Sequence, residues 1–127
     1  MQTIAVTTQK QTEFVDITRE VEAAAARLGL ADGFITVFVP HTTAGVTINE
    51  NADPDVVHDM QQALERMVPW TAGYRHAEGN AAAHVKASLM GSSVRIPIRR
   101  GTLQLGTWQA VYFCEFDGPR KRNVWAM

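Results

Sequence analysis

The sequence has a single cysteine, no long apolar run and almost no net charge, and each of these absences excludes a class of protein. Cys114 has no second cysteine with which to form an internal disulfide, and alone it cannot form a cysteine-based zinc site. No apolar stretch approaches the roughly 20 residues needed to span a bilayer. No basic segment followed by an apolar segment opens the chain, so we expect a cytoplasmic protein without a membrane partner.

The length of 127 residues fits one domain, because two domains of half this size would each bury too small a core. Hydrophobic residues make up 46% of the chain and charged residues 20%, which argues against disordered, collagen-like and coiled-coil classes. The sequence contains neither an internal repeat nor a linker. We therefore expect a single domain over residues 1–127.

The net charge of −1 conceals an uneven distribution along the chain. Residues 1–65 carry 3 basic and 10 acidic side chains, whereas residues 66–127 carry 9 basic and 3 acidic side chains. A nucleic-acid-binding protein usually combines basic clusters with a net positive charge, so we expect no nucleic-acid partner. The two halves are expected to pack on each other or on neighbouring subunits, which leaves room for a local anion site in the second half.

Hydrophobic periodicity predicts elements in the order ββαββααβββ. The predicted helices are Arg19–Leu28, Pro54–Met67 and Ala81–Met90. The predicted strands are Gln2–Gln9, Phe14–Ile17, Gly33–Pro40, Ala44–Asn49, Ser93–Arg99, Leu103–Phe116 and Arg122–Met127. Strands that are joined by short turns pair antiparallel. We therefore expect an α+β domain, with a largely antiparallel sheet or sandwich and two to three helices packed on one side.

Three local patterns make more specific predictions. Thr18 is expected to cap the first helix, and Asp53 the second. Gly33–Pro40 is aromatic and β-branched almost throughout, which predicts a strand buried on both faces. Leu103–Phe116 predicts one long strand, in which Gly106 marks a bulge or a close backbone approach.

Three of the four histidines lie among polar residues at the ends of predicted elements, and imidazole is the commonest metal ligand. His41 follows a predicted strand, whereas His76 and His84 flank the start of a predicted helix. Three histidines with one open position would suit catalytic zinc; alternatively, each caps a loop or bonds a backbone carbonyl. His58, beside Asp59, is expected to be a solvated helix residue outside the site.

A second group of polar side chains surrounds the junction between a predicted strand and the second helix. Glu50 has no capping role there, so it could serve as a general base or as a ligand for a hard cation. Asn49 is either a turn residue or a group that orients a polar ligand. Thr107 and Gln109 share one face of a predicted strand, where plain solvent exposure competes with a binding role.

Basic residues of the second half are candidates for binding an anion, although a single basic residue is more often a solvated charge. They are Lys86, Arg99, Arg100, Arg120, Lys121 and Arg122. The sequence contains neither a glycine-rich phosphate loop nor a nucleophile elbow. Cys114 lies in an apolar run and is expected to be a small buried hydrophobe.

Three blocks of the sequence resemble the YjbQ-like family, which is also described as a secondary thiamine-phosphate synthase family. The blocks are His41–Pro54, His76–Gly91 and Gly101–Gln109. They follow one another in the order found in the family, and the resemblance covers nearly the whole chain. Three long blocks make this resemblance far more specific than a single short motif.

The resemblance implies a trimer of α+β subunits with a polar pocket near the subunit boundaries. It also implies a weak or auxiliary thiamine-phosphate synthase activity, which couples a pyrimidine diphosphate to a thiazole phosphate and releases pyrophosphate. Several members are similar in carrying a metal near their histidines. Many relatives have a polar residue at the position of Ala82, so this chain lacks one side chain that could bind or orient a metal.

These patterns together define one expected site. A divalent metal, zinc or magnesium, is expected at His41, His76 and His84, with Glu78 as a further ligand. The expected catalytic residues are His41, Glu50 and His84. The expected substrate-binding residues are Asn49, Lys86, Thr107, Gln109 and Arg120. The alternatives are a metal-dependent hydrolase of small phosphate or ester substrates and a non-catalytic homotrimer that binds a small anionic metabolite.

Overall fold

The computed structural model describes residues 1–127, which form three helices and eight strands. The helices are α1 (Thr18–Arg27), α2 (Pro54–Met67) and α3 (Ala81–Met90). The strands are β1 (Gln2–Thr7), β2 (Glu13–Asp16), β3 (Gly33–Phe38), β4 (Ala44–Glu50), β5 (Ser93–Arg99), β6 (Thr102–Leu103), β7 (Gln109–Glu115) and β8 (Lys121–Ala126). None of the helices has the length and apolar character needed to cross a bilayer.

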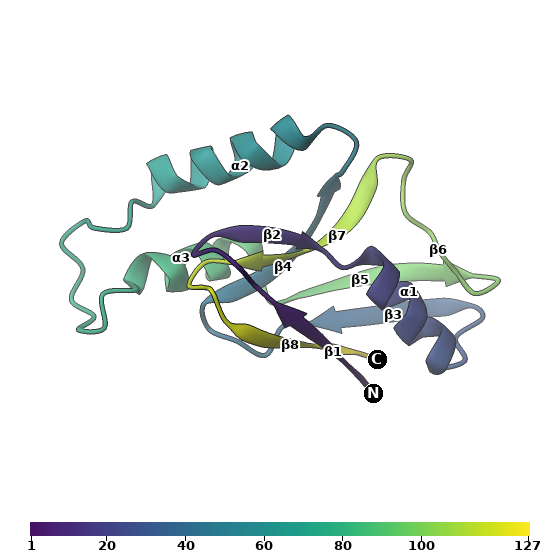
Figure 1. The fold of residues 1–127 in the computed structure, drawn as a ribbon. Helices are drawn as coiled ribbons and strands as arrows, with labels where there is room; N and C mark the ends of the chain where they lie inside the picture. The colour runs from purple at the N-terminus through teal and green to yellow at the C-terminus, as the bar shows by residue number, and fades with distance from the viewer.

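The strands form two sheets that face each other (Figure 1). Sheet A has the order β1-β8-β3-β5-β6, and sheet B has the order β2-β7-β4. Every strand pair is antiparallel, as the short connections predicted. The α+β class with largely antiparallel sheets and three helices is therefore confirmed.

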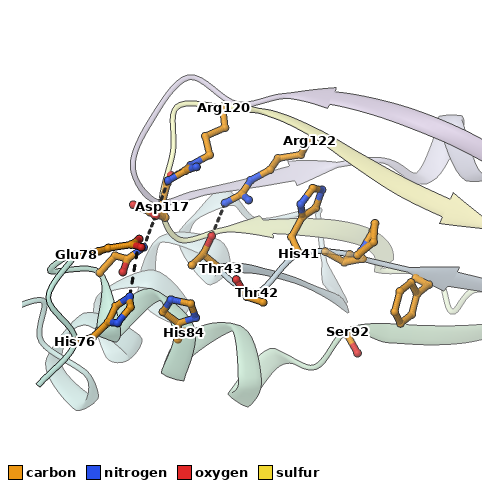
Figure 2. A pocket seen from close by; sticks show the side chains of 14 residues that line it. His41, Thr42, Thr43, His76, Glu78, His84, Ser92, Asp117, Arg120 and Arg122 are labelled. Atoms are coloured by element: carbon orange, nitrogen blue, oxygen red, sulfur yellow. Dashed lines mark hydrogen bonds and ion pairs between the residues drawn. The ribbon is translucent and has the colours of Figure 1, made fainter. Parts of the chain in front are cut away.

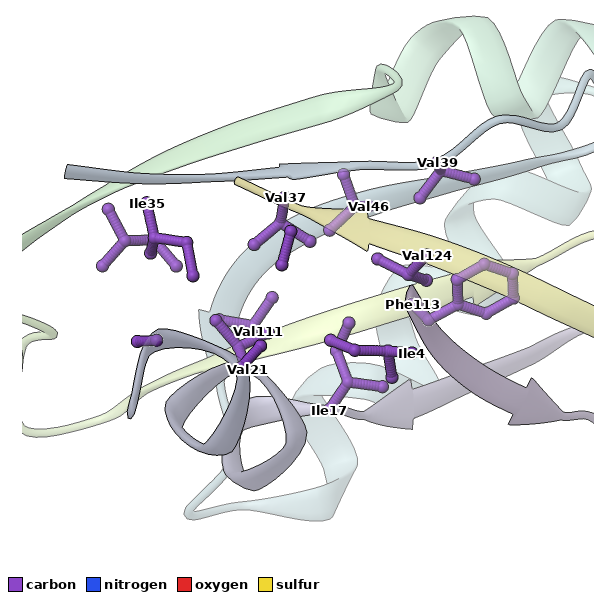
Figure 3. Packing of buried hydrophobic residues seen from close by; sticks show 14 of the residues in the cluster. Ile4, Ile17, Val21, Ile35, Val37, Val39, Val46, Val111, Phe113 and Val124 are labelled. Atoms are coloured by element: carbon purple, nitrogen blue, oxygen red, sulfur yellow. The ribbon is translucent and has the colours of Figure 1, made fainter. Parts of the chain in front are cut away.

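The main hydrophobic core lies between the two sheets and under α1 (Figure 3). Val37 of β3 meets Val111 and Phe113 of β7 there, and all three are fully buried. Val21 brings the apolar face of α1 into the same cluster. Burial of each such side chain contributes about 1.5–3 kcal/mol, so this cluster holds the two sheets in register.

A smaller second core lies on the other face of sheet B, where α2 and α3 cover it. Tyr112 and Cys114 of β7 pack there against Ala83 of α3 and Leu64 of α2. Because alternate residues of β7 enter the two cores, this strand is buried on both faces. Cys114 is fully buried, which confirms it as a small hydrophobe, and burial raises the pKa of its thiol.

The prediction that Gly33–Pro40 is buried on both faces is wrong. The strand ends at Phe38, and only its inward residues, such as Ile35, enter the core. Phe34 is 50% exposed, and the guanidinium carbon of Arg95 lies 4.1 Å from the centre of its ring. Phe34 thus lies under Arg95 on the outer face of the sheet, whereas Ile35 and Val37 face the core.

The two predicted helix caps have different outcomes. Asp53 caps α2 as expected, because its Oδ1 accepts a hydrogen bond of 2.9 Å from the Asp55 N–H. Thr18 does not cap α1 but is its first helical residue, and the Asp16 carboxylate accepts hydrogen bonds from its N–H and hydroxyl. The Thr18 hydroxyl instead accepts a 2.9 Å bond from the Val111 N–H, which ties α1 to β7.

The predicted single strand Leu103–Phe116 is also wrong, because the chain crosses here from sheet A to sheet B. The structure forms β6 and β7 with a turn between them. Gln109 closes this turn: its N–H donates to the Gly106 carbonyl at 3.0 Å, and its Oε1 accepts from the Gly106 N–H at 2.8 Å. Thr107 therefore lies in a turn and not on the face of a strand.

Candidate functional site

An open cavity of about 610 Å³ lies where the end of β3, the start of β4, the beginning of α3 and the β7–β8 turn meet (Figure 2). Five of the residues expected in the site line it together. They are His41, His76, Glu78, His84 and Arg120. A cavity of this size is typical of a site for a small molecule.

Arg122, the second residue of β8, is held rigidly at the wall of this cavity. Its Nε donates to one oxygen of the Glu115 carboxylate at 2.9 Å, and its Nη2 donates to the other oxygen and, at 2.8 Å, to the Thr43 hydroxyl. Its Nη1 makes no hydrogen bond within the chain and is not sealed from solvent. The guanidinium therefore keeps one donor group free to meet a ligand in the cavity.

Glu115 is the buried anion that fixes this arginine. The side chain is fully buried, and burial alone would raise the pKa of its carboxyl. Hydrogen bonds from Arg122, the Thr8 hydroxyl and the Asp117 N–H outweigh that penalty and hold the pKa below its usual range. The carboxylate stays ionised near neutral pH, so the ion pair is a permanent part of the site.

Arg120 stands beside Arg122 and is oriented by the β7–β8 turn. Its Nε donates to the Asp117 carbonyl, and its Nη2 to the Asp117 carboxylate, each at 2.8 Å. The Asn80 amide donates to the same carboxylate at 2.9 Å, so the turn is linked to the N-terminus of α3. Both arginines thus reach the cavity in fixed orientations.

The His41 side chain contacts β8 beyond the point where β3 stops pairing with it. The last residue pair between the two strands is Phe38 with Trp125, and the His41 ring lies beside the backbone of Asn123, two residues away from Trp125 in β8. Its Nε2 lies 3.0 Å from the Asn123 nitrogen and 3.1 Å from the Asn123 carbonyl oxygen. Since the backbone occupies Nε2 in either tautomer, Nδ1 is the ring nitrogen left to act on a ligand.

The His41 imidazole is neutral at physiological pH. Burial lowers the pKa of the ring, and the positive charge of Arg122 lowers it further. The hydrogen bond to Asn123 opposes these effects without cancelling them. A neutral ring either donates from Nδ1 or presents a lone pair there, depending on the tautomer.

His76 and His84 form a pair on the opposite wall of the cavity. Their ring centres lie 5.2 Å apart with the rings edge to face, and His76 Nε2 lies 3.9 Å from a carboxylate oxygen of Glu78 (Figure 2). No three His, Cys, Asp or Glu side chains of the chain are grouped as a metal site. The pair could supply two ligands to a divalent metal, and a third would have to come from a shifted side chain or another molecule.

Four other expected site residues lie together, but away from the cavity. Glu50 pairs with Gln109 across the far ends of β4 and β7, with Asn49 and Thr107 next to them. The seven residues of β4 separate this end from the cavity end, which is about 20 Å at ~3.3 Å per residue. The Asn49 amide oxygen accepts from the Glu50 N–H at 2.7 Å, so it serves the local backbone.

Lys86 also lies outside the cavity. Its side chain is buried between α3 and α2, where its ammonium donates to the carboxylate of Glu65 at 2.6 Å. This ion pair links the two helices that cover sheet B. The structure therefore does not bring Lys86 near the phosphate-binding position expected for it.

The comparisons with known proteins agree on a family. The family model for UPF0047 proteins of the YjbQ-like type matches residues 2–127. The UPF0047 protein YugU of Bacillus subtilis is 50% identical over 126 residues, which cover 98% of this chain and 96% of that protein. A UPF0047 protein of Methanocaldococcus jannaschii is 48% identical over 118 residues, which cover 93% of this chain and 86% of that protein.

Solved structures show the same fold. A crystal structure of a YjbQ/UPF0047 family protein from Clostridium acetobutylicum superposes with a TM-score of 0.98 at 51% identity, covering 100% of this chain and 98% of that one. The molecule is thus an α+β protein of two antiparallel sheets with a polar cavity at one end of the sandwich. The chain belongs to the YjbQ-like UPF0047 family.

Proposed function

We propose that the chain binds a small phosphate- or diphosphate-bearing metabolite in this cavity. The observation that carries the proposal is the guanidinium of Arg122, which lines the cavity, is fixed by Glu115 and Thr43, and makes no hydrogen bond within the chain at Nη1. A guanidinium held in this way loses little conformational entropy when it binds an oxyanion. Arg120 supplies a second oriented guanidinium on the same wall.

The beginning of α3 supports the same ligand class. Asn80 precedes the helix and lines the cavity, but its side chain makes no capping hydrogen bond. The first turn of α3 contains no acidic residue of its own, and the one carboxylate bound at this end, that of Asp117, is shared with Arg120. An oxyanion in the cavity would gain from this dipole as well as from the two arginines.

The specific reaction we propose is that of an auxiliary thiamine-phosphate synthase, in line with the family resemblance. The thiazole nitrogen forms a bond to the pyrimidine methylene carbon while the bond from that carbon to the diphosphate oxygen breaks. Negative charge grows on the leaving oxygen, where Arg120 and Arg122 would stabilise it. A neutral His41 would donate a hydrogen bond from Nδ1 to the same oxygen, and His84, when protonated, would transfer its proton to the departing diphosphate.

The test is product formation from both substrates by the purified protein. We expect thiamine phosphate and pyrophosphate in equal amounts. For His84→Ala we expect the rate of product formation to fall by a factor of about 10² or more. His58→Ala is the matched control, because His58 is exposed on α2 and lies outside the cavity. No product with or without added zinc or magnesium would refute this reaction. Titration with inorganic phosphate tests the binding proposal separately.

The pair of His76 and His84 favours one alternative, a metal-dependent hydrolase of small phosphate or ester substrates. A divalent ion, when bound, supplies charge neutralisation and activates water. Hydrolysis of simple phosphate esters, lost in His76→Ala, would favour this alternative. Less than about one-tenth of a metal ion per chain after purification without chelators would contradict it. Phosphate binding without turnover of any substrate would identify a non-catalytic binding protein.

We further propose that the chain acts as a homotrimer. Only Leu64 of α2 is buried within the chain, and Met67 at the end of that helix is 66% exposed. Trp108, in the turn before β7, is 60% exposed. A neighbouring subunit that covers such apolar groups could also bring the Glu50 and Gln109 end of its sheet B to the cavity. Light scattering after size-exclusion chromatography should give three times the mass of one chain, and a monomer would refute this proposal.

A further inference from the structure

The cavity continues into a second hollow of different chemistry. This hollow has a volume of about 480 Å³ and lies beside the C-terminal half of α3. The two hollows share four lining residues, which form the waist between them. These are His41, Thr42, His84 and Ser92.

Charge separates the two hollows. All the charged residues of the site line the first hollow, and they are Glu78, Asp117, Arg120 and Arg122. The second hollow has no lysine, arginine, aspartate or glutamate in its lining. A phosphate, a carboxylate or an ammonium group would find no partner of opposite charge there.

Hydroxyl groups and small side chains line the second hollow. Ser88 donates its hydroxyl proton to the His84 carbonyl at 3.0 Å, which leaves its oxygen free to accept a hydrogen bond. The hydroxyls of Thr42 and Ser92 make no hydrogen bond within the chain. These three groups suit a body that carries hydroxyls or other uncharged polar groups.

The packing of β4 on α3 sets the floor of this hollow. A Cβ atom at Gly45 would lie 2.7 Å from the Gly91 carbonyl oxygen, so the strand reaches the end of the helix only because this residue is glycine. The neighbouring Ala44 and Ala87 are small and line the hollow. Small side chains of both elements therefore line the hollow where the strand meets the end of the helix.

We infer that the ligand is a phosphomonoester with an uncharged, hydroxylated body. Its phosphate lies at Arg120 and Arg122, its body fills the hollow beside Ser88, and the ester oxygen lies at the waist between His41 and His84. This inference rests on the proposed binding of a phosphate-bearing metabolite, specifies the class of that ligand, and is independent of the synthase reaction. It excludes bisphosphates whose second phosphate would have to enter the uncharged hollow, because desolvating an unpaired phosphate is costly.

Isothermal titration with four probes tests the inference. The probes are inorganic phosphate, ribose 5-phosphate, ribose and fructose 1,6-bisphosphate. We expect ribose 5-phosphate to bind at least about ten-fold more tightly than inorganic phosphate, since its hydroxyls add several neutral hydrogen bonds. We expect ribose alone to bind more weakly than inorganic phosphate and ribose 5-phosphate. We expect fructose 1,6-bisphosphate to bind no more tightly than inorganic phosphate.

Two variants locate the body of the ligand. Ser88→Phe fills the uncharged hollow from an exposed helix position, so it should reduce the affinity for ribose 5-phosphate to that for inorganic phosphate. Ser92→Ala keeps the shape and should weaken ribose 5-phosphate about three- to ten-fold. Leu89→Phe is the matched control, because Leu89 is exposed on α3 and lines neither hollow.

The outcomes separate this inference from the proposed function. No binding of inorganic phosphate or of any phosphate ester would refute both. Binding of inorganic phosphate with no gain from the ribose body would refute only the two-part ligand. Tighter binding of fructose 1,6-bisphosphate than of ribose 5-phosphate would also refute the two-part ligand. So would an equal decrease in affinity for ribose 5-phosphate and for inorganic phosphate in Ser88→Phe.

Discussion

Glu115→Gln tests whether the arginine at the cavity wall depends on a buried ion pair. The substitution keeps the shape of the side chain but removes the charge opposite Arg122, which is 6% exposed. Removing one partner of a buried pair typically costs about 3–5 kcal/mol, because the other charge stays buried and uncompensated. We expect a loss of about 3 kcal/mol, at the lower end of that range, because Arg122 Nη1 is not sealed from solvent.

Thermal and denaturant unfolding at pH 7 measure this loss. For a chain of 127 residues, a loss of this size corresponds to a decrease in Tm of roughly 10–15 °C. The double variant Glu115→Leu with Arg122→Met removes both charges and should recover at least half of the lost stability. It should nevertheless bind no phosphate, so folding and ligand binding are measured separately.

The pH dependence of the same variant supplies a second check. Since the folded protein holds the pKa of Glu115 below its unfolded value of about 4.3, the wild type gains stability above that value. The gain is lost as the pH falls through the folded pKa, where Glu115 becomes protonated. The difference between wild type and Glu115→Gln should therefore shrink below about pH 4. A loss below about 1 kcal/mol at pH 7, or a difference that does not change with pH, would refute the reasoning.

Three further predictions concern the packing of the helices and the single thiol. Gly45→Ala places a methyl group 2.7 Å from the Gly91 carbonyl oxygen and should lower the unfolding free energy by about 1–3 kcal/mol in urea titrations. Glu65→Gln leaves the buried Lys86 without its anion and should destabilise the protein more than Lys86→Met, with phosphate affinity unchanged in both. Cys114 should react with alkylating reagents only after unfolding, because its thiol is buried and its pKa is raised.

Elements with local start and stop signals could be predicted from the sequence. The helix Ala81–Met90 has its predicted bounds, with Gly91 after its last residue, and Asp53 caps the next helix upstream as expected. The strand Ser93–Arg99 also has its predicted bounds, because its apolar residues alternate strictly. These signals lie within a few residues of the boundary that they set, so no tertiary contact is needed to read them.

Features that depend on how the two sheets are arranged could not be predicted from local signals in the sequence. The run Leu103–Phe116 looks continuous because apolar residues recur along it, at Leu103, Leu105 and Trp108 and then throughout Ala110–Cys114. The chain nevertheless turns at Gly106, where the side chain of Gln109 closes the turn and β7 enters a different sheet. Likewise, the composition of Gly33–Pro40 does not reveal that one face of that strand meets solvent.

The candidate site shows a similar division. The three histidines of the cavity could be predicted as polar residues at the ends of elements. Arg122, in contrast, is one of six basic residues that the sequence alone does not distinguish. One signal was present: Glu115 interrupts the apolar run before Phe116, and Arg122 is in phase with the buried Val124 and Ala126. Two inward-facing opposite charges on consecutive strands indicate a buried ion pair.

The polar residues at the far end of sheet B have a sufficient structural role in the single chain. The Gln109 side chain closes a turn, the Asn49 amide bonds the neighbouring backbone, and the Glu50 carbonyl accepts the Tyr112 hydroxyl. The carboxylate of Glu50 makes no hydrogen bond of its own within the chain. It is therefore the charged group of this cluster that the fold of the single chain leaves without a hydrogen-bond partner.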